Sequence, residues 1–310
     1  MLRTIFFGTP EFALPSLERV AAEHEVLAVI TQPDRPKGRG CRLTPPPVKE
    51  LSLRLGLPVL QMENVNTDEA FRAIAAYRPD VIVVVAFGQL LRQRLLTLPP
   101  KGCINVHASL LPELRGAAPI HRAIIEGRTV TGVTTIFMDA GMDTGDIILQ
   151  KSLGIGPDET AGELHDRLKV LGAELLGETL ALVAQGKVAP IPQDSSRATY
   201  APLLTRDIER INWQEPAQNV HNLVRGLNPW PGAYSGHKGR ILKIWRTKLG
   251  DQRQDSLVPG RITAITGSGF VVETGAGTLE ILEVQPECRH TMSAREYASG
   301  YCLNPGEILL

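Results

Sequence analysis

Cysteine is scarce in this chain of 310 residues, and the few cysteines that occur lie far apart. The four are Cys41, Cys103, Cys288 and Cys302, and no two of them form a C-x-x-C pair. Zinc-binding modules and disulfide-stapled secreted domains both depend on closely spaced cysteines, so neither class is indicated. We therefore expect a protein of the reducing cytoplasm that has no structural metal.

Long hydrophobic runs are also missing. The longest, residues 81–87, is far shorter than the roughly 20 residues that a membrane-spanning helix needs. Met1-Leu2-Arg3 leads directly into a strand pattern, so no secretory signal is visible. We expect no association with a membrane.

An excess of charge of one sign is absent too, because 33 lysines and arginines balance 33 aspartates and glutamates. A neutral sum argues against a protein that coats nucleic acid over its whole surface, although local basic patches can exist within it. Hydrophobic residues make up 43% and charged residues 21%, which is typical of globular proteins. A chain of this length favours two domains.

The first half of the chain alternates short apolar runs with helical patterns. The runs lie at 4–8, 26–31, 81–87, 104–108 and 133–139. This rhythm predicts a Rossmann-like α/β fold, with a doubly wound, mostly parallel sheet. Between 161 and 186 leucines recur every three or four residues after Thr160, a suitable N-cap, which predicts one long helix. We place this domain at residues 1–189.

The remainder of the chain has a different pattern. Residues 190–204 are rich in proline and serine, and we expect a linker there. A helix is expected at 220–226, followed by short strands at 241–245, 261–265, 270–273 and 279–284 with glycine-rich turns. Short antiparallel strands at this density predict a small OB-like β-barrel at 205–310.

The glycine fingerprint of dinucleotide-binding folds is not present after the first strand. Gly8-Thr9-Pro10-Glu11-Phe12-Ala13 lacks the second and third glycines that allow close approach to a pyrophosphate. We therefore do not expect a nicotinamide cofactor.

Three polar residues are candidates for a reacting centre. Asn105 and His107 alternate at the end of a predicted strand, and Asp143 lies in the glycine-flanked loop 141–146 after another. Each has a structural explanation by itself: the histidine as a buried polar group, the aspartate as a turn residue, the asparagine as a loop cap. Together they match acyl transfer, which needs an oxyanion donor and a proton shuttle with an orienting partner.

These segments also carry a resemblance to a known family. Residues 105–112, 115–120, 131–134 and 143–146 resemble the signature of folate-dependent formyltransferases, and 7–10, 31–36 and 228–233 extend the similarity along the chain. The resemblance implies that Asn105, His107 and Asp143 are catalytic and that the formyl donor is 10-formyltetrahydrofolate, with no metal and no NAD. It further implies that the folate contacts two segments: Ser109, Leu110, Leu111 and Pro112, and Gln89, Leu90 and Leu91. Glu113 and Leu114 depart from the family, which usually has a basic and an aromatic residue there.

Two basic segments indicate the acceptor. Residues 32–49 are rich in proline and glycine, and residues 225–250 contain no acid and carry interleaved aromatics. Lysine and arginine can simply point outward from exposed strands, but two patches flanking an acyl-transfer site favour a large anionic acceptor such as aminoacyl-tRNA. The cations that we expect to contact it are Arg35, Lys37, Arg39, Arg42, Lys238, Lys243 and Lys248.

The similarity is greatest to family members that act on methionyl-tRNA, which implies initiator methionyl-tRNA as the acceptor and Arg39 as the functional arginine of the basic loop. We expect a monomer. The alternatives are a formyltransferase acting on a small amine such as a nucleotide-linked amino sugar, a formyltetrahydrofolate hydrolase-like enzyme, and a non-catalytic tRNA-binding protein that shares only the fold. The long basic loop at 32–49 favours the tRNA acceptor.

Overall fold

The computed structural model describes residues 1–38, 40, 42–251 and 258–310, so Arg39 and Cys41 lie outside the described residues. The chain forms two compact units. The first contains Met1–Pro119, Thr131–Leu153 and His165–Ala201, and the second contains Ile120–Val130, Gly154–Leu164 and Pro202–Leu310. Two segments within the predicted first domain (1–189), Ile120–Val130 and Gly154–Leu164, therefore pack in the second unit, and the extended stretch at 190–201 packs in the first.

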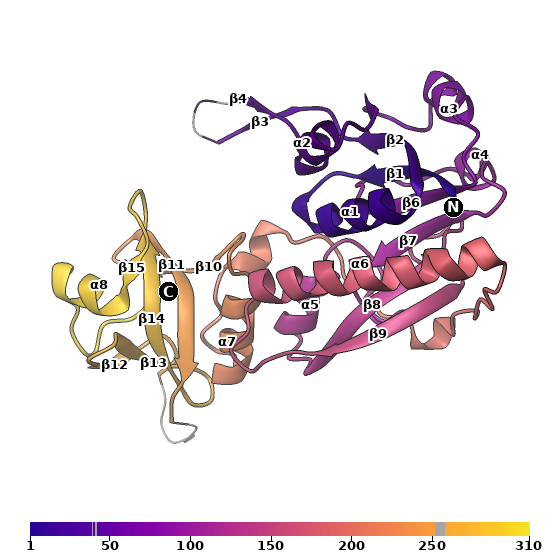
Figure 1. The fold of residues 1–310 in the computed structure, drawn as a ribbon. Helices are drawn as coiled ribbons and strands as arrows, with labels where there is room; N and C mark the ends of the chain where they lie inside the picture. Colours follow the sequence, from indigo (N-terminus) through magenta and orange to yellow (C-terminus); the bar gives the residue numbers. More distant parts are fainter. Residues whose placement is uncertain (39, 41, 252–257) are drawn as a thin grey trace. The chain divides into compact units, whose positions relative to one another are not determined.

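The first unit is built on a seven-stranded sheet with the order β5-β2-β1-β6-β7-β8-β9 (Figure 1). Its strands are β1 (Arg3–Gly8), β2 (Glu25–Thr31), β5 (Val59–Gln61), β6 (Val81–Val85), β7 (Cys103–His107), β8 (Val130–Phe137) and β9 (Ile147–Gly154). Its helices are α1 (Leu14–Glu23), α2 (Pro47–Arg54), α3 (Asp68–Ala75), α4 (Gln93–Leu96) and most of α6 (Ala161–Gln185), and it also has the short 3-10 turns Glu11–Ala13 and Ser195–Arg197.

The doubly wound sheet predicted from the sequence is confirmed. Strands β5, β2, β1, β6 and β7 are parallel, and the winding reverses at β1, with β2 on one side of it and β6 on the other. Strand β8, however, pairs with β7 in antiparallel register, with His107 opposite Thr134, so the parallel reading of residues 133–139 was wrong. An apolar run does not encode strand direction, because both directions bury the same side chains.

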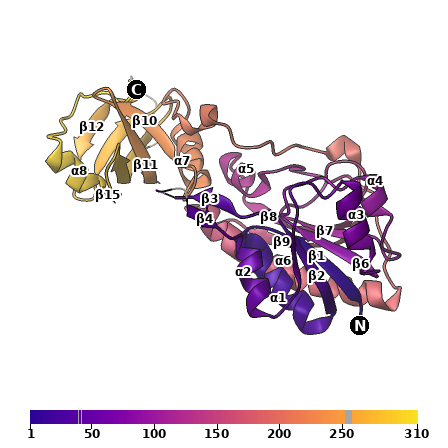
Figure 2. The same ribbon diagram turned by 90° about the horizontal axis from the view of Figure 1, so that it is seen from above.

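Alternation along the strands divides the core of this unit into two layers, with helices on both sides of the sheet (Figure 2). Ile5, Phe7, Ile82 and Val84 pack with Ile74 of α3 and with α4 on one face. On the other face, Gly172 of α6 lies against Val106 and Val133. The long helix predicted at 161–186 is confirmed, and Thr160 caps it by accepting from the Glu163 backbone N–H at 3.2 Å. Asn105 and His107, which alternate with Val106, therefore project from the face opposite α6.

A small hairpin extends from this unit between β2 and α2. It consists of β3 (Arg35–Lys37) and β4 (Arg42–Thr44), whose register pairs Arg35 with Thr44 and Lys37 with Arg42. The sequence predicted an irregular exposed loop here, because prolines and glycines prevent a helix. A two-stranded ribbon tolerates Pro36, since proline can occupy an edge strand.

The second unit is an antiparallel sheet with the order β10-β11-β14-β13-β12, and β15 pairs with β14. Its elements are α5 (Pro119–Ile125), the 3-10 turn Arg206–Glu209, α7 (Ala217–Gly226), β10 (Ala233–His237), β11 (Arg240–Leu249), β12 (Ile262–Ile265), β13 (Phe270–Glu273), β14 (Thr278–Pro286), β15 (Met292–Ser293) and α8 (Ala294–Gly300). The core between the sheet and its helices contains Val220, Ile244, Phe270 and Tyr297.

The C-terminal tail joins the two edge strands of this sheet. Leu310 exchanges two backbone hydrogen bonds with Gly236 of β10, at 2.7 and 2.8 Å. On the other side, the Ile262 N–H of β12 donates to the Glu307 carbonyl, and the Leu309 N–H donates to the Gly260 carbonyl, each at 2.8 Å. The tail therefore closes the sheet in the manner of the small barrel that the strand pattern predicted, because it provides backbone partners for both edge strands.

Candidate active site

Three polar side chains from distant parts of the sequence meet in the first unit. Asn105 and His107 come from the end of β7, and Asp143 comes from the loop after β8. The Asn105 Nδ2 lies 3.5 Å from Asp143 Oδ1, and the His107 Nδ1 lies 3.6 Å from Asp143 Oδ2. His107 is buried and Asp143 is 17% exposed. An amide, an imidazole and a carboxylate thus share one small volume, as the sequence predicted.

The route by which Asp143 arrives differs from the expectation. Because β8 is antiparallel to β7, it ends at Phe137, opposite Ile104 and away from His107. The loop after β8 must therefore fold back to bring its carboxylate to the end of β7. Gly145 makes this possible, since a Cβ there would lie 1.7 Å from the Phe137 carbonyl oxygen. Asp143 itself has a φ of +55°, a left-handed conformation that aspartate tolerates better than most residues.

Hydrogen bonds fix the roles of the two imidazole nitrogens. The His107 Nε2 lies 3.0 Å from the Leu114 carbonyl, which only accepts hydrogen bonds, so Nε2 must carry a proton. The other ring nitrogen, Nδ1, faces Asp143. A protonated Nδ1 would be stabilised by that carboxylate. Leu114 departs from the family residue, but it binds His107 through its main chain, which any residue supplies.

The carboxylate of Asp143 has a second partner. Its Oδ2 accepts the Gly116 N–H at 2.8 Å. Gly116 has a φ of +119°, and a Cβ there would lie 2.8 Å from the Ala201 carbonyl oxygen, so the site requires glycine. One backbone donor and two side chains therefore converge on a single carboxylate.

The predicted folate-binding loop 109–112 follows directly from His107. Ser109 and Leu111 are buried, and Leu110 and Pro112 are partly exposed. Thr134 of β8 holds the loop, since its Oγ1 donates to the Ser109 carbonyl at 2.6 Å and accepts from the Leu111 N–H at 3.1 Å. The side chains of this loop that are open to a ligand are thus those of Leu110 and Pro112.

The second predicted folate segment, Gln89 to Leu91, follows β6. The Gln89 side chain is occupied, because its Nε2 donates to the Met62 and Glu63 carbonyls and its Oε1 accepts from the Val65 N–H. Leu91 is buried, whereas Leu90 is 61% exposed. A large exposed apolar side chain at the end of a sheet strand is suited to an aromatic ring.

The basic hairpin presents its cations together. Because directly opposed residues of an antiparallel pair point to the same side, Arg35, Lys37 and Arg42 share one face. All three are exposed, and none forms an ion pair with another described residue. Lys37 and Arg42 are direct neighbours of like charge, an unfavourable arrangement that a bound anion would relieve. Lys49 does not belong to this set, because Asp34 accepts from its Nζ at 2.9 Å.

The predicted lysines of the second unit are in different situations. Lys238 pairs with Glu307 at 3.0 Å, and Lys243 donates to the Pro231 carbonyl at 2.6 Å. Desolvation opposes the ionisation of Glu307, but hydrogen bonds from His237 and Lys238 outweigh it and lower the pKa of that carboxyl to about 2. Lys248 is exposed and forms no ion pair with any described residue.

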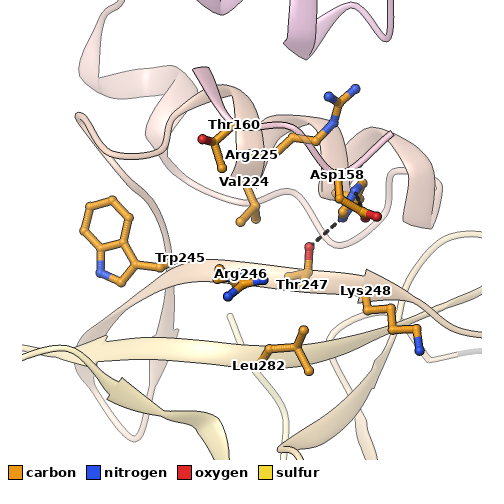
Figure 3. A pocket seen from close by; sticks show the side chains of 10 residues that line it. Asp158, Thr160, Val224, Arg225, Trp245, Arg246, Thr247, Lys248 and Leu282 are labelled. Atoms are coloured by element: carbon orange, nitrogen blue, oxygen red, sulfur yellow. Dashed lines mark hydrogen bonds and ion pairs between the residues drawn. The ribbon is translucent and has the colours of Figure 1, made fainter. Parts of the chain in front are cut away.

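Lys248 lines an open pocket of about 230 Å³ within the second unit. Figure 3 shows Trp245 and Lys248 at the two ends of one stretch of β11, with Thr247 between them. The Thr247 Oγ1 lies 2.9 Å from the His221 Nδ1, within hydrogen-bonding distance. Two further cations, Arg225 and Arg246, line the pocket against a single acid, Asp158. The register of β11 shifts on both sides of Arg246, and such bulges redirect side chains. Burial lowers the pKa of His221, which is therefore neutral at neutral pH.

Sequence reasoning missed the residues that hold these groups. Gln193 lies in the stretch predicted as a linker, yet its side chain contacts the Asp143 loop. Thr134 and Gln150 hold the loop 109–112, since the Gln150 Nε2 donates to the Leu111 carbonyl at 2.8 Å. A strand threonine and two glutamines have no spacing that marks them, because their partners are backbone carbonyls far away in the sequence.

In the part of the chain that the structure describes, none of the helices has both the length and the hydrophobicity that a membrane span requires.

Two family models match this chain. The family model for formyl transferase matches residues 2–180, and that for the formyl transferase C-terminal domain matches residues 203–302. Two methionyl-tRNA formyltransferases, from Acetivibrio thermocellus and Moorella thermoacetica, are 48% and 50% identical over 309 residues, covering 99% of this chain and 99% of each relative.

A solved structure shares the fold. It is an N-formyltransferase from Helicobacter canadensis in complex with folinic acid and dTDP-3-aminofucose, which is 18% identical to this chain with a TM-score of 0.68. The match covers 91% of this chain and 99% of that one. The two family models together span nearly all of the sequence, and the near-full-length relatives share about half of their residues with it. The chain therefore belongs to the formyl transferase family, and within it to the methionyl-tRNA formyltransferases.

Proposed function

We propose that this protein transfers the formyl group of 10-formyltetrahydrofolate to the α-amino group of initiator methionyl-tRNA. The observation that carries the proposal is the meeting of Asn105, His107 and Asp143 around one small volume beside the loop 109–112. In this proposal the first unit performs the chemistry, and the second unit, which contains most of residues 205–310, binds tRNA. The proposal includes a cytoplasmic location and a monomeric state.

The reaction needs no covalent intermediate with the enzyme. The amine nitrogen attacks the formyl carbon, which becomes tetrahedral and places negative charge on its oxygen. The donors suited to that oxygen are the Asn105 amide and the Nδ1–H of a protonated His107, since the Nε2–H of that ring is already bonded to the Leu114 carbonyl. The carbon–N10 bond then breaks, N10 takes a proton, and the attacking nitrogen loses one, which leaves tetrahydrofolate and a formylated amine. Asp143 orients and stabilises the charged His107, and it accepts the amine's proton directly or through water.

The folate would lie against Leu110 and Pro112 from one loop and Leu90 from the other, the partly exposed members of the two predicted segments. Ser109, Leu111, Gln89 and Leu91 would act mainly through their backbone or by supporting their loops, because they are buried or already bonded. The apolar side chains suit the pterin ring, and the neighbouring backbone groups suit its polar edge.

The tRNA would contact the cationic face of the hairpin, Arg35, Lys37 and Arg42, together with Arg39, whose role rests on the resemblance alone. Positive charges gathered on a narrow exposed ribbon suit the phosphates of a duplex stem. In the second unit the pocket with Lys248 and Arg246 is better placed to bind phosphate than Lys243, whose ammonium already donates to Pro231. Lys238 contributes more weakly, because Glu307 offsets its charge.

The test is to mix the purified chain with 10-formyltetrahydrofolate and charged methionyl-tRNA, with free methionine and a nucleotide-linked amino sugar as competing acceptors. We expect formylation of the charged tRNA alone. Formylation of the amino sugar would assign the protein to a small acceptor. Tight tRNA binding with no loss of formyl from the folate would reduce it to a binding protein, and release of formate without an acceptor would indicate a hydrolase.

A further inference from the structure

The side-chain amide of Gln193 joins two parts of the active site. Its Oε1 accepts two hydrogen bonds from Arg115, from Nε at 3.1 Å and from Nη2 at 2.8 Å. Its Nε2 donates to the carbonyls of Asp143 and Gly145, both at 2.8 Å. Because arginine only donates and carbonyls only accept, the orientation of the amide is fixed, and all of its hydrogen-bonding capacity is used.

Two partners of Gln193, the Asp143 backbone and the Arg115 guanidinium, depend on hydrogen bonds from their surroundings. Asp143 has a left-handed backbone conformation, which persists only where the surroundings enforce it. Arg115 is 3% exposed, and its guanidinium has no carboxylate partner among the described residues. A buried guanidinium without an acceptor is costly, so Gln193 satisfies the arginine and the arginine in turn orients Gln193.

The dipeptide Arg115-Gly116 therefore holds Asp143 both at its side-chain carboxylate and at its backbone carbonyl. The Gly116 N–H binds the carboxylate directly, and the Arg115 side chain binds the Asp143 carbonyl through Gln193. We propose that Gln193 and Arg115 are positioning residues that set the Asp143 carboxylate against His107 and Asn105. This inference rests on the proposed function, because it gives Gln193 a role only if Asp143 takes part in the reaction.

The consequence for catalysis follows from the distances. The Asp143 Oδ2 lies 3.6 Å from the His107 Nδ1, so a shift of the loop by about 1 Å would remove their interaction. Misplacement of this size costs roughly 10- to 100-fold in rate. The hydrogen bonds that Gln193 makes to described residues reach Arg115, Asp143 and Gly145, and none reaches the loop 109–112 or the hairpin. The loss should therefore appear in kcat and leave KM for both substrates nearly unchanged.

Two substitutions separate this role from a general structural one. Gln193→Met keeps the length of the side chain and removes every hydrogen bond. Gln193→Glu keeps and strengthens the bond to Arg115 but places a carboxylate oxygen against the two carbonyls. Gln185→Met, at an exposed position of α6, is the matched control for the loss of a glutamine amide. Each variant is measured for kcat, both KM values and thermal unfolding, alone and combined with Asp143→Ala.

We expect both Gln193 variants to lose about 10- to 100-fold in kcat, with Gln193→Glu unfolding at nearly the wild-type temperature. In the Asp143→Ala background, Gln193→Glu should cause no further loss, because the carboxylate that it positions is gone. Wild-type turnover in Gln193→Glu, or a loss that multiplies with that of Asp143→Ala, would overturn the inference. Full activity of Asp143→Ala alone would instead refute the proposed catalytic trio.

Discussion

Asn105 offers the sharpest test of the chemistry, because its contribution to catalysis separates cleanly from its contribution to stability. Its side chain is only partly buried, and its one hydrogen bond to a described residue, to Asp143, has a length of 3.5 Å. A bond at this outer limit contributes little, so Asn105→Ala should cost less than about 1 kcal/mol in the free energy of unfolding. Removal of an oxyanion donor should cost about 2.7 to 4 kcal/mol in the activation barrier, or roughly 10² to 10³ in kcat.

Asn105→Asp sharpens the test, since it keeps the size of the side chain. It would place a second carboxylate about 3.5 Å from that of Asp143, and two such charges repel by about 5 kcal/mol at an effective dielectric constant of about 20. This variant should therefore be at least as slow as Asn105→Ala and also less stable, unless one carboxyl takes up a proton.

The assay is formylation of charged methionyl-tRNA under saturating folate, with thermal unfolding of each variant measured in parallel. We expect the unfolding midpoint of Asn105→Ala to stay close to that of the wild type while kcat falls at least a hundredfold. If Asn105→Ala retained more than about a tenth of the wild-type kcat, the side-chain amide would not be the oxyanion donor. A large fall in the unfolding midpoint would show that its role is structural.

Three further predictions concern other parts of the molecule. Lys37→Ala should raise KM for methionyl-tRNA without weakening folate binding, and it should reduce the salt slope of tRNA binding by about one unit. The control Lys187→Ala, at an exposed position, should change neither quantity. An unchanged salt slope in Lys37→Ala would show that the hairpin is not part of the tRNA interface. Burial raises the pKa of the Cys103 thiol to about 12, so this thiol should not react with an alkylating reagent at pH 8 in the native protein. Mass spectrometry should find Cys103 unmodified and the exposed Cys288 modified. Rapid labelling of Cys103 would contradict its buried environment. The pKa of Glu307 is about 2 in the folded protein and near 4.5 when the chain is unfolded. Its contribution to the free energy of unfolding is therefore present above about pH 4.5 and is lost as the pH falls toward 2. Urea unfolding from pH 6 to pH 2 should show a weaker pH dependence in Glu307→Gln than in the wild type, and identical curves would refute this contribution.

Much of the fold was predictable because local patterns encode it. The spacing of leucines predicted α6, and its cap at Thr160 is present. Strand runs predicted β1, β2, β6 and β7 to within a few residues. In the second unit they predicted β11, β12, β13 and β14, but not β10 or β15. The direction of β8 was not predictable, because an apolar run buries the same side chains in either direction. The passage of residues 120–130 and 154–164 into the second unit has no local signal either, because it depends on contacts with residues far away in the sequence.

The sequence by itself determined which chemical groups are available: one amide, one imidazole and one carboxylate in short motifs, and cations in two segments. Tertiary structure decided how each is used. In the folded structure the Leu114 carbonyl accepts the hydrogen bond of His107 Nε2, and the loop after the antiparallel strand β8 places Asp143 beside His107. Gln193, from a stretch with the composition of a linker, binds the Asp143 carbonyl. Tertiary structure also neutralised Lys49 and occupied Lys243 while leaving Lys248 free of ion pairs with the described residues. The physical reason is that most of these contacts join a side chain to a backbone group. Every residue carries such groups, so the residue types in the sequence do not show which residue will be the hydrogen-bond partner.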